Sequence, residues 1–410
     1  MINSMQQLKL LAVLSLLAAL TACTGEKSVD IDENDLINIE INIPVDSYAL
    51  FREEAVLIAA SLSDSQLVSQ CLLAGLDNRA YLSDSMKTLF SRFPPGGIML
   101  FAYNLNGTKD EVRTFLGEAA AFIANKCGIT PFVAVDHEGG LVHRFGPGVM
   151  KLPPPAFYWE LSLEQGEDMA LQMLDEQAIF SAWEICDLGI TMVLAPVAET
   201  LNTENQVFLQ TRTYGPDSDF VEKAAAAFIR AMNDEGIACV VKHFPGSSSQ
   251  DTHFESAFIN ADSKTLESMI EPFRGIIAKL DPAAVMVSHN VIFAVDPVNN
   301  ASLSPEVISV WLKGELGFNG IVLADDLTMK AVSSRDISPE EAAVMALNAG
   351  IDMVMCWPHN MASVHGAILD ALNDGRLPRA RLLDAAERVI SEKLRSGLLS
   401  TGLQSAGINQ

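Results

Sequence analysis

Short apolar runs alternate with segments of helical period along the chain from about residue 50 onward. The runs are apolar at successive positions, so both of their faces would be buried, as in parallel strands covered by helices. Between them, Phe220, Ala224, Phe228 and Ala231 recur at helical spacing and predict a helix over 218–233. A second helix is predicted over 264–278. The predicted strands are 70–76, 97–102, 132–135, 190–195, 238–242, 284–288, 321–324 and 352–356.

Eight strands that alternate with helices favour an α/β fold of the (β/α)8 TIM-barrel type. One helix start is marked by Ser304-Pro305-Glu306, where an N-cap serine precedes a proline at the first helical position. The competing fold, an open doubly wound sheet, would be signalled by a glycine-rich phosphate-binding turn, and none follows a predicted strand. We therefore predict a single barrel domain over residues 49–398.

The first 22 residues have the pattern of a secretory signal segment. Lys9 is followed by an apolar run over 10–20 that is too short to span a membrane as a helix. The run ends at Leu20-Thr21-Ala22-Cys23, which resembles the lipobox of bacterial lipoproteins, where the signal is cut before the cysteine and its sulfur is acylated. An ordinary signal peptide with a chance cysteine is the alternative.

The lipobox implies that Cys23 carries the lipid and that the protein is anchored to a bacterial membrane. The residue after the cysteine is Thr24 and not an aspartate, which is compatible with sorting to the outer membrane, with the protein facing the periplasm. Residues 23–48 are acidic and lack a clear period, so we interpret them as a tether between lipid and domain. Residues 399–410 are predicted to be a short tail.

Composition and charge narrow the possible partners. The chain has 27 Lys+Arg against 52 Asp+Glu, a formal net charge of −25, and 49% hydrophobic residues, which is a globular composition. The negative charge excludes a nucleic-acid partner, because such binding draws on clustered Lys and Arg. The other cysteines show no metal-ligand spacing, so we predict no structural metal and no disulfide framework, although one bridge stays open. They are Cys71, Cys127, Cys186, Cys239 and Cys356.

Polar residues follow most of the predicted strands at the end where barrels carry their chemistry. Each alone is most simply a solvated loop residue or a helix cap. Six such positions around one rim indicate a shared pocket. They are Asn104, Asp136-His137-Glu138-Gly139-Gly140, Glu199, Lys242-His243, His289-Asn290 and Asp325-Asp326.

Asp325, one of these positions, and a separate stretch at 251–253 are candidates for acid, base or nucleophile. Asp325 directly follows the apolar run 321–324, so a barrel strand would aim its carboxylate at the pocket axis, where it could attack an electrophilic carbon or stabilise a cation. Asp251-Thr252-His253 offers a proton carrier, since an aspartate two positions from a histidine can orient the imidazole. Spacing alone leaves the alternative of an exposed loop histidine open.

Six stretches, in order and spacing along one barrel, resemble the bacterial β-N-acetylglucosaminidases of glycoside hydrolase family 3 over residues 63–395. They are Gly96-Gly97-Ile98-Met99-Leu100-Phe101 with Asn104; Val135-Asp136-His137-Glu138-Gly139-Gly140-Leu141-Val142-His143-Arg144-Phe145; Ala195-Pro196-Val197-Ala198; Arg212-Thr213-Tyr214-Gly215; Lys242-His243-Phe244-Pro245-Gly246; and Ala324-Asp325-Asp326-Leu327-Thr328-Met329.

The resemblance implies roles for individual residues. Asp325 looks like the family's nucleophile, and Asp251 with His253 looks like the dyad that this branch uses as general acid/base. Sugar-hydroxyl contacts and the lining of the same pocket would come from Asp136, Arg144, Arg212, Lys242, His243 and His289.

The sequence departs from the family pattern in two places. The stretch between Gly246 and Asp251 is only Ser247-Ser248-Ser249-Gln250, which is shorter than usual in the family. An alternative alignment would pair Glu255-Ser256-Ala257 with the family's Asp-Ser-His and lose the histidine; the first alignment keeps both dyad residues. Leu141 stands where the family has arginine.

The resemblance therefore implies a retaining exo-β-N-acetylglucosaminidase that acts on peptidoglycan- or chitin-type oligosaccharides without a cofactor or a metal. The alternatives are a non-catalytic sugar-binding lipoprotein, a phosphorylase of the same family, which a neutral histidine base would permit, and a β-glucosidase of the family.

Overall fold

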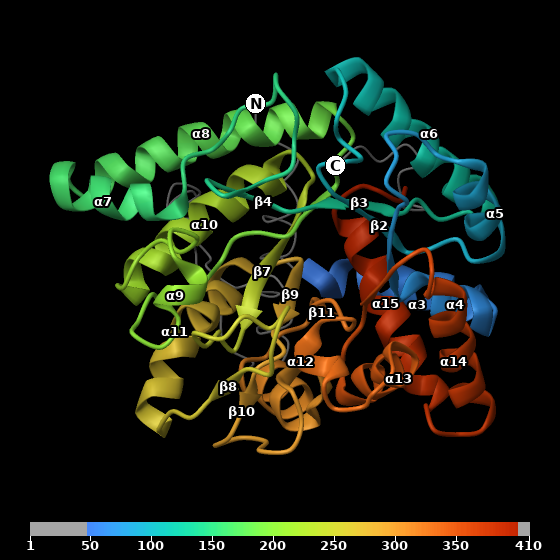
Figure 1. Ribbon diagram of the computed structural model, residues 1–410. Helices are drawn as coiled ribbons and strands as arrows, with labels where there is room; N and C mark the ends of the chain where they lie inside the picture. The colour runs from blue at the N-terminus through green and yellow to red at the C-terminus, as the bar shows by residue number, and fades with distance from the viewer. Residues whose placement is uncertain (1–46, 401–410) are drawn as a thin grey trace, which may run out of the picture. The chain divides into compact units, whose positions relative to one another are not determined.

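The structure, a computed structural model, describes residues 47–400, and its centre is an eight-stranded sheet (Figure 1). Its strands are β1 (Leu72–Gly75), β2 (Gly97–Leu100), β3 (Phe132–Val135), β6 (Met192–Val193), β7 (Ala238–Phe244), β9 (Ala284–Val287), β11 (Ile321–Ala324) and β12 (Val354–Cys356). Each neighbouring pair in the order β11-β9-β7-β6-β3-β2-β1-β12 is parallel.

The sheet closes between its two outer strands. Leu323 of β11 forms a parallel bridge with Met353, and Ala324 N donates to Met353 O at 3.1 Å. Each predicted strand overlaps one observed strand, with β7 extending two residues beyond its predicted end, so the (β/α)8 barrel is confirmed. Shorter strands lie outside it: β4 (His137–Gly139) pairs with β5 (Val142–His143), and β8 (Phe258–Ile259) pairs with β10 (Val291–Ile292).

Helices surround the strands (Figure 1). They are α3 (Ser47–Ser61), α4 (Asp64–Gln70), α5 (Asp84–Arg92), α6 (Lys109–Cys127), α7 (Pro155–Gln165), α8 (Glu167–Asp187), α9 (Gln206–Leu209), α10 (Ser218–Asp234), α11 (Ser263–Leu280), α12 (Lys330–Ser333), α13 (Pro339–Ala349), α14 (Met361–Asn373) and α15 (Arg379–Arg395). A 3-10 turn, η1 (Ala301–Leu303), and a π-helix, η2 (Glu306–Glu315), lie between β10 and β11. None of the helices in residues 47–400 combines the length and apolarity needed to cross a membrane.

The helices begin where the sequence supplies caps. At α10, the helix predicted over 218–233, Asp217 accepts a hydrogen bond from Phe220 N. At α6, Thr108 and Glu111 form a capping box, and Gly128 ends the helix with φ of 76°. After Ser304-Pro305 the chain winds as the π-helix η2, and Ser304 Oγ accepts from Val307 N at 3.3 Å.

Strand residues alternate between two apolar layers. Ile321 and Leu323 of β11 lie in the cluster inside the barrel, whereas Val322 and Ala324 belong to the larger cluster between strands and helices. The same alternation holds in β3, β7 and β9. This alternation decides which way the residues just beyond each strand point.

Helix α15 packs across the amino-terminal end of the barrel, opposite the polar clusters. Its Val389 joins the interior cluster, and Lys393 Nζ lies 5.3 Å from the centre of the Phe132 ring and 2.9 Å from Gln70 Oε1. Burial lowers the pKa of Lys393 to about 7. This end is thus closed by a packed helix, and the opposite end is left for chemistry.

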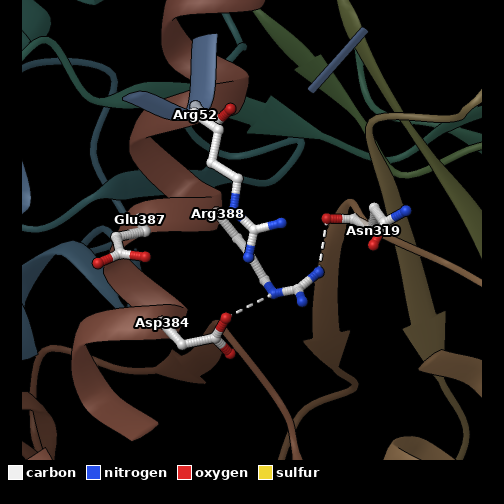
Figure 2. A pocket seen from close by; sticks show the side chains of 6 residues that line it. Arg52, Asn319, Asp384, Glu387 and Arg388 are labelled. Atoms are coloured by element: carbon white, nitrogen blue, oxygen red, sulfur yellow. Dashed lines mark hydrogen bonds and ion pairs between the residues drawn. The ribbon is translucent and has the colours of Figure 1, made fainter. Parts of the chain in front are cut away.

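A polar depression beside α15 shows how the helix is fixed to the barrel. Figure 2 shows Arg388 between Asp384 and Asn319, with Arg52 of α3 nearby. Arg388 Nη1 donates to Asn319 O at 2.5 Å and Nε to Asp384 Oδ1 at 3.3 Å. Because Asn319 lies two residues before β11, these bonds connect α15 to the start of the strand that is followed by Asp325.

The predicted domain boundaries are only partly covered by the structure. The first helix of the described residues, α3, covers Ser47–Ser61 and so includes the predicted start of the barrel domain at 49. The predicted signal segment 1–22, with Cys23, the tether up to residue 46 and residues 401–410 lie outside the described residues.

Candidate active site

Strand alternation brings three of the predicted site residues to the same end of the barrel axis. Asp136 continues the inward-facing Phe132 and Ala134 of β3, and Asp325 continues the inward-facing positions of β11. Lys242 is likewise in step with the inward-facing positions of β7, Ala238 and Val240. These polar side chains therefore cap the apolar interior at its carboxyl-terminal end.

A network of two carboxylates and three cations forms the floor of the site. Lys242 Nζ lies 2.9 Å from Asp136 Oδ1 and 2.6 Å from Glu138 Oε1. Arg144 Nη2 reaches Asp136 Oδ2 at 3.1 Å, and Arg212 donates from Nε and Nη2 to the two oxygens of Glu138, both at 2.8 Å. Because Asp136 and Glu138 each meet two cations, the network orders all five side chains.

The network keeps its members ionised. Burial alone would raise the pKa of Asp136, but Lys242 and Arg144 outweigh it and hold that pKa below its ordinary value. Burial likewise opposes the charge of Glu138, and Lys242 with Arg212 lowers its pKa strongly. The two carboxylates raise the pKa of Lys242 although burial acts against it. Fixed charges of both signs therefore face the pocket at neutral pH.

His243 is held by Glu199, which lies beyond β6. His243 Nδ1 is 2.8 Å from Glu199 Oε1, and that oxygen also accepts from Ser247 Oγ at 2.9 Å. The Phe208 ring packs edge-on against the imidazole at 6.3 Å. His243 Nε2 has no hydrogen-bond partner among residues 47–400, which leaves it able to contact a ligand.

The structure brings Asp251 and His253 together as a pair. His253 Nδ1 lies 2.7 Å from Asp251 Oδ1, and the same oxygen accepts from His253 N at 2.9 Å. The side chains are 42% and 60% exposed. An Nδ1 held by a carboxylate leaves Nε2 as the nitrogen that exchanges protons with a ligand. The structure therefore pairs the two residues that the first alignment keeps as the dyad.

The loop that carries this pair is attached to the loop after β11. Thr252 O accepts from Ala331 N at 3.0 Å. Burial lowers the pKa of His289, and the charges of Asp325 and His253 act on it in opposite directions. Both groups are therefore within electrostatic range of one buried histidine.

Asp325 is oriented by the backbone around it. Its Oδ1 accepts from Asp326 N at 2.8 Å, and its own N lies 3.3 Å from Val287 O of β9. Asp326 turns the other way: Trp357 Nε1 lies 3.1 Å from each of its oxygens, and Thr328 donates to it from N and Oγ1. Asp326 is thus a structural carboxylate that fixes the turn carrying Asp325.

His289, which was predicted to line the pocket, is fully buried, and both of its ring nitrogens have partners within the protein. It continues the outward-facing Val285 and Val287 of β9, so its ring is buried beside the pocket rather than in it. Nδ1 lies 2.7 Å from Ser302 Oγ, and Nε2 lies 3.0 Å from the carbonyl oxygen of Asp326. With both nitrogens occupied, His289 supports the Asp325-Asp326 turn.

Asn104 was also expected at the shared rim, and its side chain is fully buried in loop contacts instead. Its Oδ1 accepts from Phe101 N at 3.0 Å, and Nδ2 donates to the carbonyls of Asp77 and Arg79, both at 2.8 Å. Leu141, which replaces the family's arginine, is 68% exposed. Asn104 therefore shapes the loops around the pocket without entering it.

Comparison with known proteins identifies the family. Residues 72–392 match the Glycosyl hydrolase family 3 N terminal domain. The chain belongs to glycosyl hydrolase family 3.

Individual members of the family resemble this chain over most of its length. A beta-hexosaminidase of Tolumonas auensis is 33% identical over 293 residues, which cover 70% of this chain and 82% of the relative. A family 3 beta-N-acetylglucosaminidase from Paenibacillus sp. str. FPU-7 superposes with a TM-score of 0.75 at 29% identity, over 83% of this chain and 65% of that longer one. A beta-N-acetylhexosaminidase from Beutenbergia cavernae gives 0.72 at 27% identity, over 82% and 99%.

The site of this family 3 glycoside hydrolase combines a carboxylate and an Asp–His pair with a network of buried charges. Asp325 supplies a carboxylate, and His253 supplies an imidazole oriented by a second carboxylate, which together are the parts of a displacement at an acetal carbon. Among residues 47–400, no group of three or more His, Cys, Asp or Glu side chains is arranged to hold a metal ion.

Several supporting residues in this family 3 enzyme were given no individual role from the sequence. Glu138, on β4, follows Asp136 by two residues, so strand alternation would have placed the two side chains on the same face. Thr328 could have been found as well, because an aspartate two residues before a threonine commonly accepts from its backbone N–H. Ser302, Ala331 and Trp357 give no local signal, because their partners lie far away in the sequence.

Proposed function

We propose that the protein hydrolyses terminal β-linked N-acetylglucosamine from peptidoglycan- or chitin-type oligosaccharides, with retention of configuration. The observation that carries this proposal is the Asp251–His253 pair at 2.7 Å, attached to the nucleophile loop through Thr252 and Ala331. The relatives named beta-hexosaminidase and the related beta-N-acetylglucosaminidase structure support the choice of sugar.

The first half-reaction transfers the sugar to the enzyme. His253, as imidazolium, gives the proton on Nε2 to the oxygen of the departing alcohol while an oxygen of Asp325 attacks the anomeric carbon. The bond from the anomeric carbon to the leaving oxygen breaks as the bond to Asp325 forms. The products of this step are the free alcohol, a glycosyl ester on Asp325 and a neutral His253.

The second half-reaction releases the sugar. Neutral His253 takes a proton from water, whose oxygen attacks the anomeric carbon and displaces the Asp325 carboxylate. Two inversions give net retention. Asp251 keeps Nδ1 occupied throughout, so that the same nitrogen, Nε2, gives and receives the proton.

The charged floor supplies the sugar specificity. Asp136, Arg144 and Lys242 are arranged to pair with hydroxyl groups, and His243 presents Nε2 from the neighbouring strand. A sugar that lacks a matching hydroxyl would leave one of these buried groups without a partner. The free-energy penalty of that unpaired group exceeds the net contribution of the hydrogen bond that is lost. Arg212 acts indirectly, by forming an ion pair with Glu138.

Replacing His253 with alanine should affect substrates according to their leaving group. For chitobiose, whose leaving alcohol needs a proton, kcat/KM should fall by about 10²- to 10³-fold. For the 2,4-dinitrophenyl β-N-acetylglucosaminide, kcat/KM should change little, because the leaving group departs as a stable anion and needs no proton. Steady-state kinetics on both substrates measures the difference, with the exposed His359→Ala as a control that behaves as the parent. Equal losses on both substrates would remove His253 as the proton donor.

The same assay on the parent protein separates the alternative functions. The proposal expects turnover of the nitrophenyl N-acetylglucosaminide, little turnover of the glucoside, and no acceleration by phosphate. A sugar phosphate product would instead establish a phosphorylase, and preference for the glucoside a β-glucosidase. Binding of N-acetylglucosamine without turnover on either substrate would indicate a sugar-binding protein.

Lipid attachment at Cys23, in a bacterial outer membrane with the enzyme facing the periplasm, belongs to the same proposal. The support is the Leu20-Thr21-Ala22-Cys23 sequence after the apolar run, together with Thr24. In a Gram-negative host the parent should appear in the outer-membrane fraction, and Cys23→Ser should lose that association, since no acyl chains can be added. Fractionation followed by mass spectrometry of the N-terminal peptide tests this. An unmodified Cys23 would leave an ordinary signal peptide.

A further inference from the structure

Phe254 is the most exposed large apolar side chain in the described part of the protein that lies at the active site. Its side chain is 79% exposed, and it directly follows His253 in the chain. The centres of the two rings lie 6.2 Å apart, with the ring planes inclined by 46°. A single exposed apolar side chain needs no explanation by itself, but this one lies beside the proposed proton donor.

The loop that presents Phe254 is held on both sides of it. Before Phe254, Thr252 O accepts from Ala331 N at 3.0 Å. After it, Ser256 Oγ lies 2.9 Å from Ser334 Oγ, and Phe258 N donates to Gln250 Oε1 at 2.9 Å. Phe254 N itself donates to Asp251 O at 3.0 Å. The ring is therefore presented on an ordered segment, so a ligand would not have to order the loop in order to contact it.

The chemistry of the proposed reaction fixes where the departing group must lie. His253 Nε2 has to come within about 2.6–3.2 Å of the leaving oxygen to protonate it. In an oligosaccharide that oxygen is bonded directly to the next pyranose ring. The departing sugar is thus on the His253 side of the pocket, within reach of the neighbouring aromatic ring.

An aromatic ring suits this position because a pyranose has an apolar face of C–H groups. Stacking that face on Phe254 would bury apolar surface of both partners without a charge or a hydrogen-bond donor. Charged groups in this segment are confined to Asp251, His253 and Glu255, so the recognition available at Phe254 itself is for an uncharged ring. The fixed cations of the floor lie instead around Asp136 and Glu138.

We propose that Phe254 forms the binding platform for the sugar on the leaving-group side of the scissile bond, an inference that rests on the proposed glycosidase function. The ligand class is a neutral pyranose linked through its own oxygen to the terminal N-acetylglucosamine, as in the chitin-type substrates of the proposed function. Phe254 contacts only the departing ring and takes no part in proton transfer. The platform makes the enzyme prefer oligosaccharides over glycosides of small alcohols.

The test compares two substrates that both need protonation of an alkoxide but differ in the presence of a second ring. These are chitobiose and the methyl β-N-acetylglucosaminide. In the full-length protein, Phe254→Ala should lower kcat/KM for chitobiose about tenfold, mainly through KM, and change kcat/KM for the methyl glycoside less than about twofold. Phe254→Trp should retain the parent's preference for chitobiose over the methyl glycoside. Phe180→Ala, which removes a phenylalanine of α8 that is 48% exposed, is the control.

Each outcome decides between a platform and other roles. Equal losses on both substrates, with a displaced pH profile of kcat, would overturn the platform and make Phe254 a positioning residue for His253. An unchanged ratio of the two kcat/KM values would show that the ring does not touch the departing sugar. Failure of the proposed function looks different, because the parent itself would then release no N-acetylglucosamine from either substrate.

Discussion

Asp325→Asn is expected to lower kcat/KM for the nitrophenyl β-N-acetylglucosaminide by at least about 10⁴-fold. The amide keeps the size of the side chain and can still accept from Asp326 N, as the carboxylate does at 2.8 Å. It cannot form the glycosyl ester, because an amide oxygen is a poor nucleophile and bears no charge to stabilise the oxocarbenium-like transition state. Steady-state kinetics with a discontinuous assay over hours provides the range needed.

A second variant distinguishes a missing nucleophile from a damaged fold. Asp325→Gly opens space at the same position, and added azide should then restore measurable release of nitrophenol with formation of an α-configured glycosyl azide. Asp168→Asn, an exposed aspartate in the first turn of α8, is the matched control and should behave as the parent. An Asp325→Asn protein that retains more than about one hundredth of the parent's kcat/KM would show that another group attacks the anomeric carbon.

The positions of the nucleophile and of the floor could be derived from local sequence, because strand alternation carries a direction. Once the interior residues of β3, β7 and β11 are known, Asp136, Lys242 and Asp325 follow at even spacing. The same rule would have paired Glu138 with Asp136. It would also have placed His289 on the outer side of its strand, since His289 follows Val285 and Val287 in the outer layer.

Contacts between distant loops could not be derived in this way. The dyad reaches the nucleophile loop through Thr252 and Ala331, which are 79 residues apart, and the orientation of Asp326 depends on Trp357 beyond the next strand. No periodicity encodes such pairs, since they depend on how strands and loops are arranged around the closed barrel. Asn104 illustrates the limit: a polar residue after a strand is also what a buried loop needs to satisfy its own carbonyls.

Replacing Lys242 with methionine is expected to destabilise the folded protein by about 3–5 kcal/mol at pH 8 and to abolish turnover. Lys242 is 2% exposed and contacts both Asp136 and Glu138. Methionine fills a similar volume but leaves two buried carboxylates with only one arginine each, Arg144 and Arg212. Urea denaturation of the parent and of the variant measures the difference in the free energy of unfolding.

The pH dependence of this loss identifies its cause. In the parent, Lys242 helps to hold the pKa values of Asp136 and Glu138 below their unfolded values, so their contribution to stability is present above about pH 4 and is lost as the pH falls through the folded pKa values. In the variant, burial raises both pKa values relative to the parent, so the folded protein takes up protons at a higher pH than the parent does. The difference in the free energy of unfolding should therefore be largest at pH 8 and shrink towards pH 5.

The matched control is Lys279→Met, which breaks an exposed ion pair with Glu222 and should leave stability close to that of the parent at both pH values. A loss in Lys242→Met that is independent of pH would indicate a packing defect rather than uncompensated carboxylate charge. A loss that grows towards pH 5 would contradict the role of Lys242 as the shared partner of Asp136 and Glu138. The expected pattern would instead show that the ammonium which orders the sugar-binding floor is also what allows two carboxylates to be buried side by side.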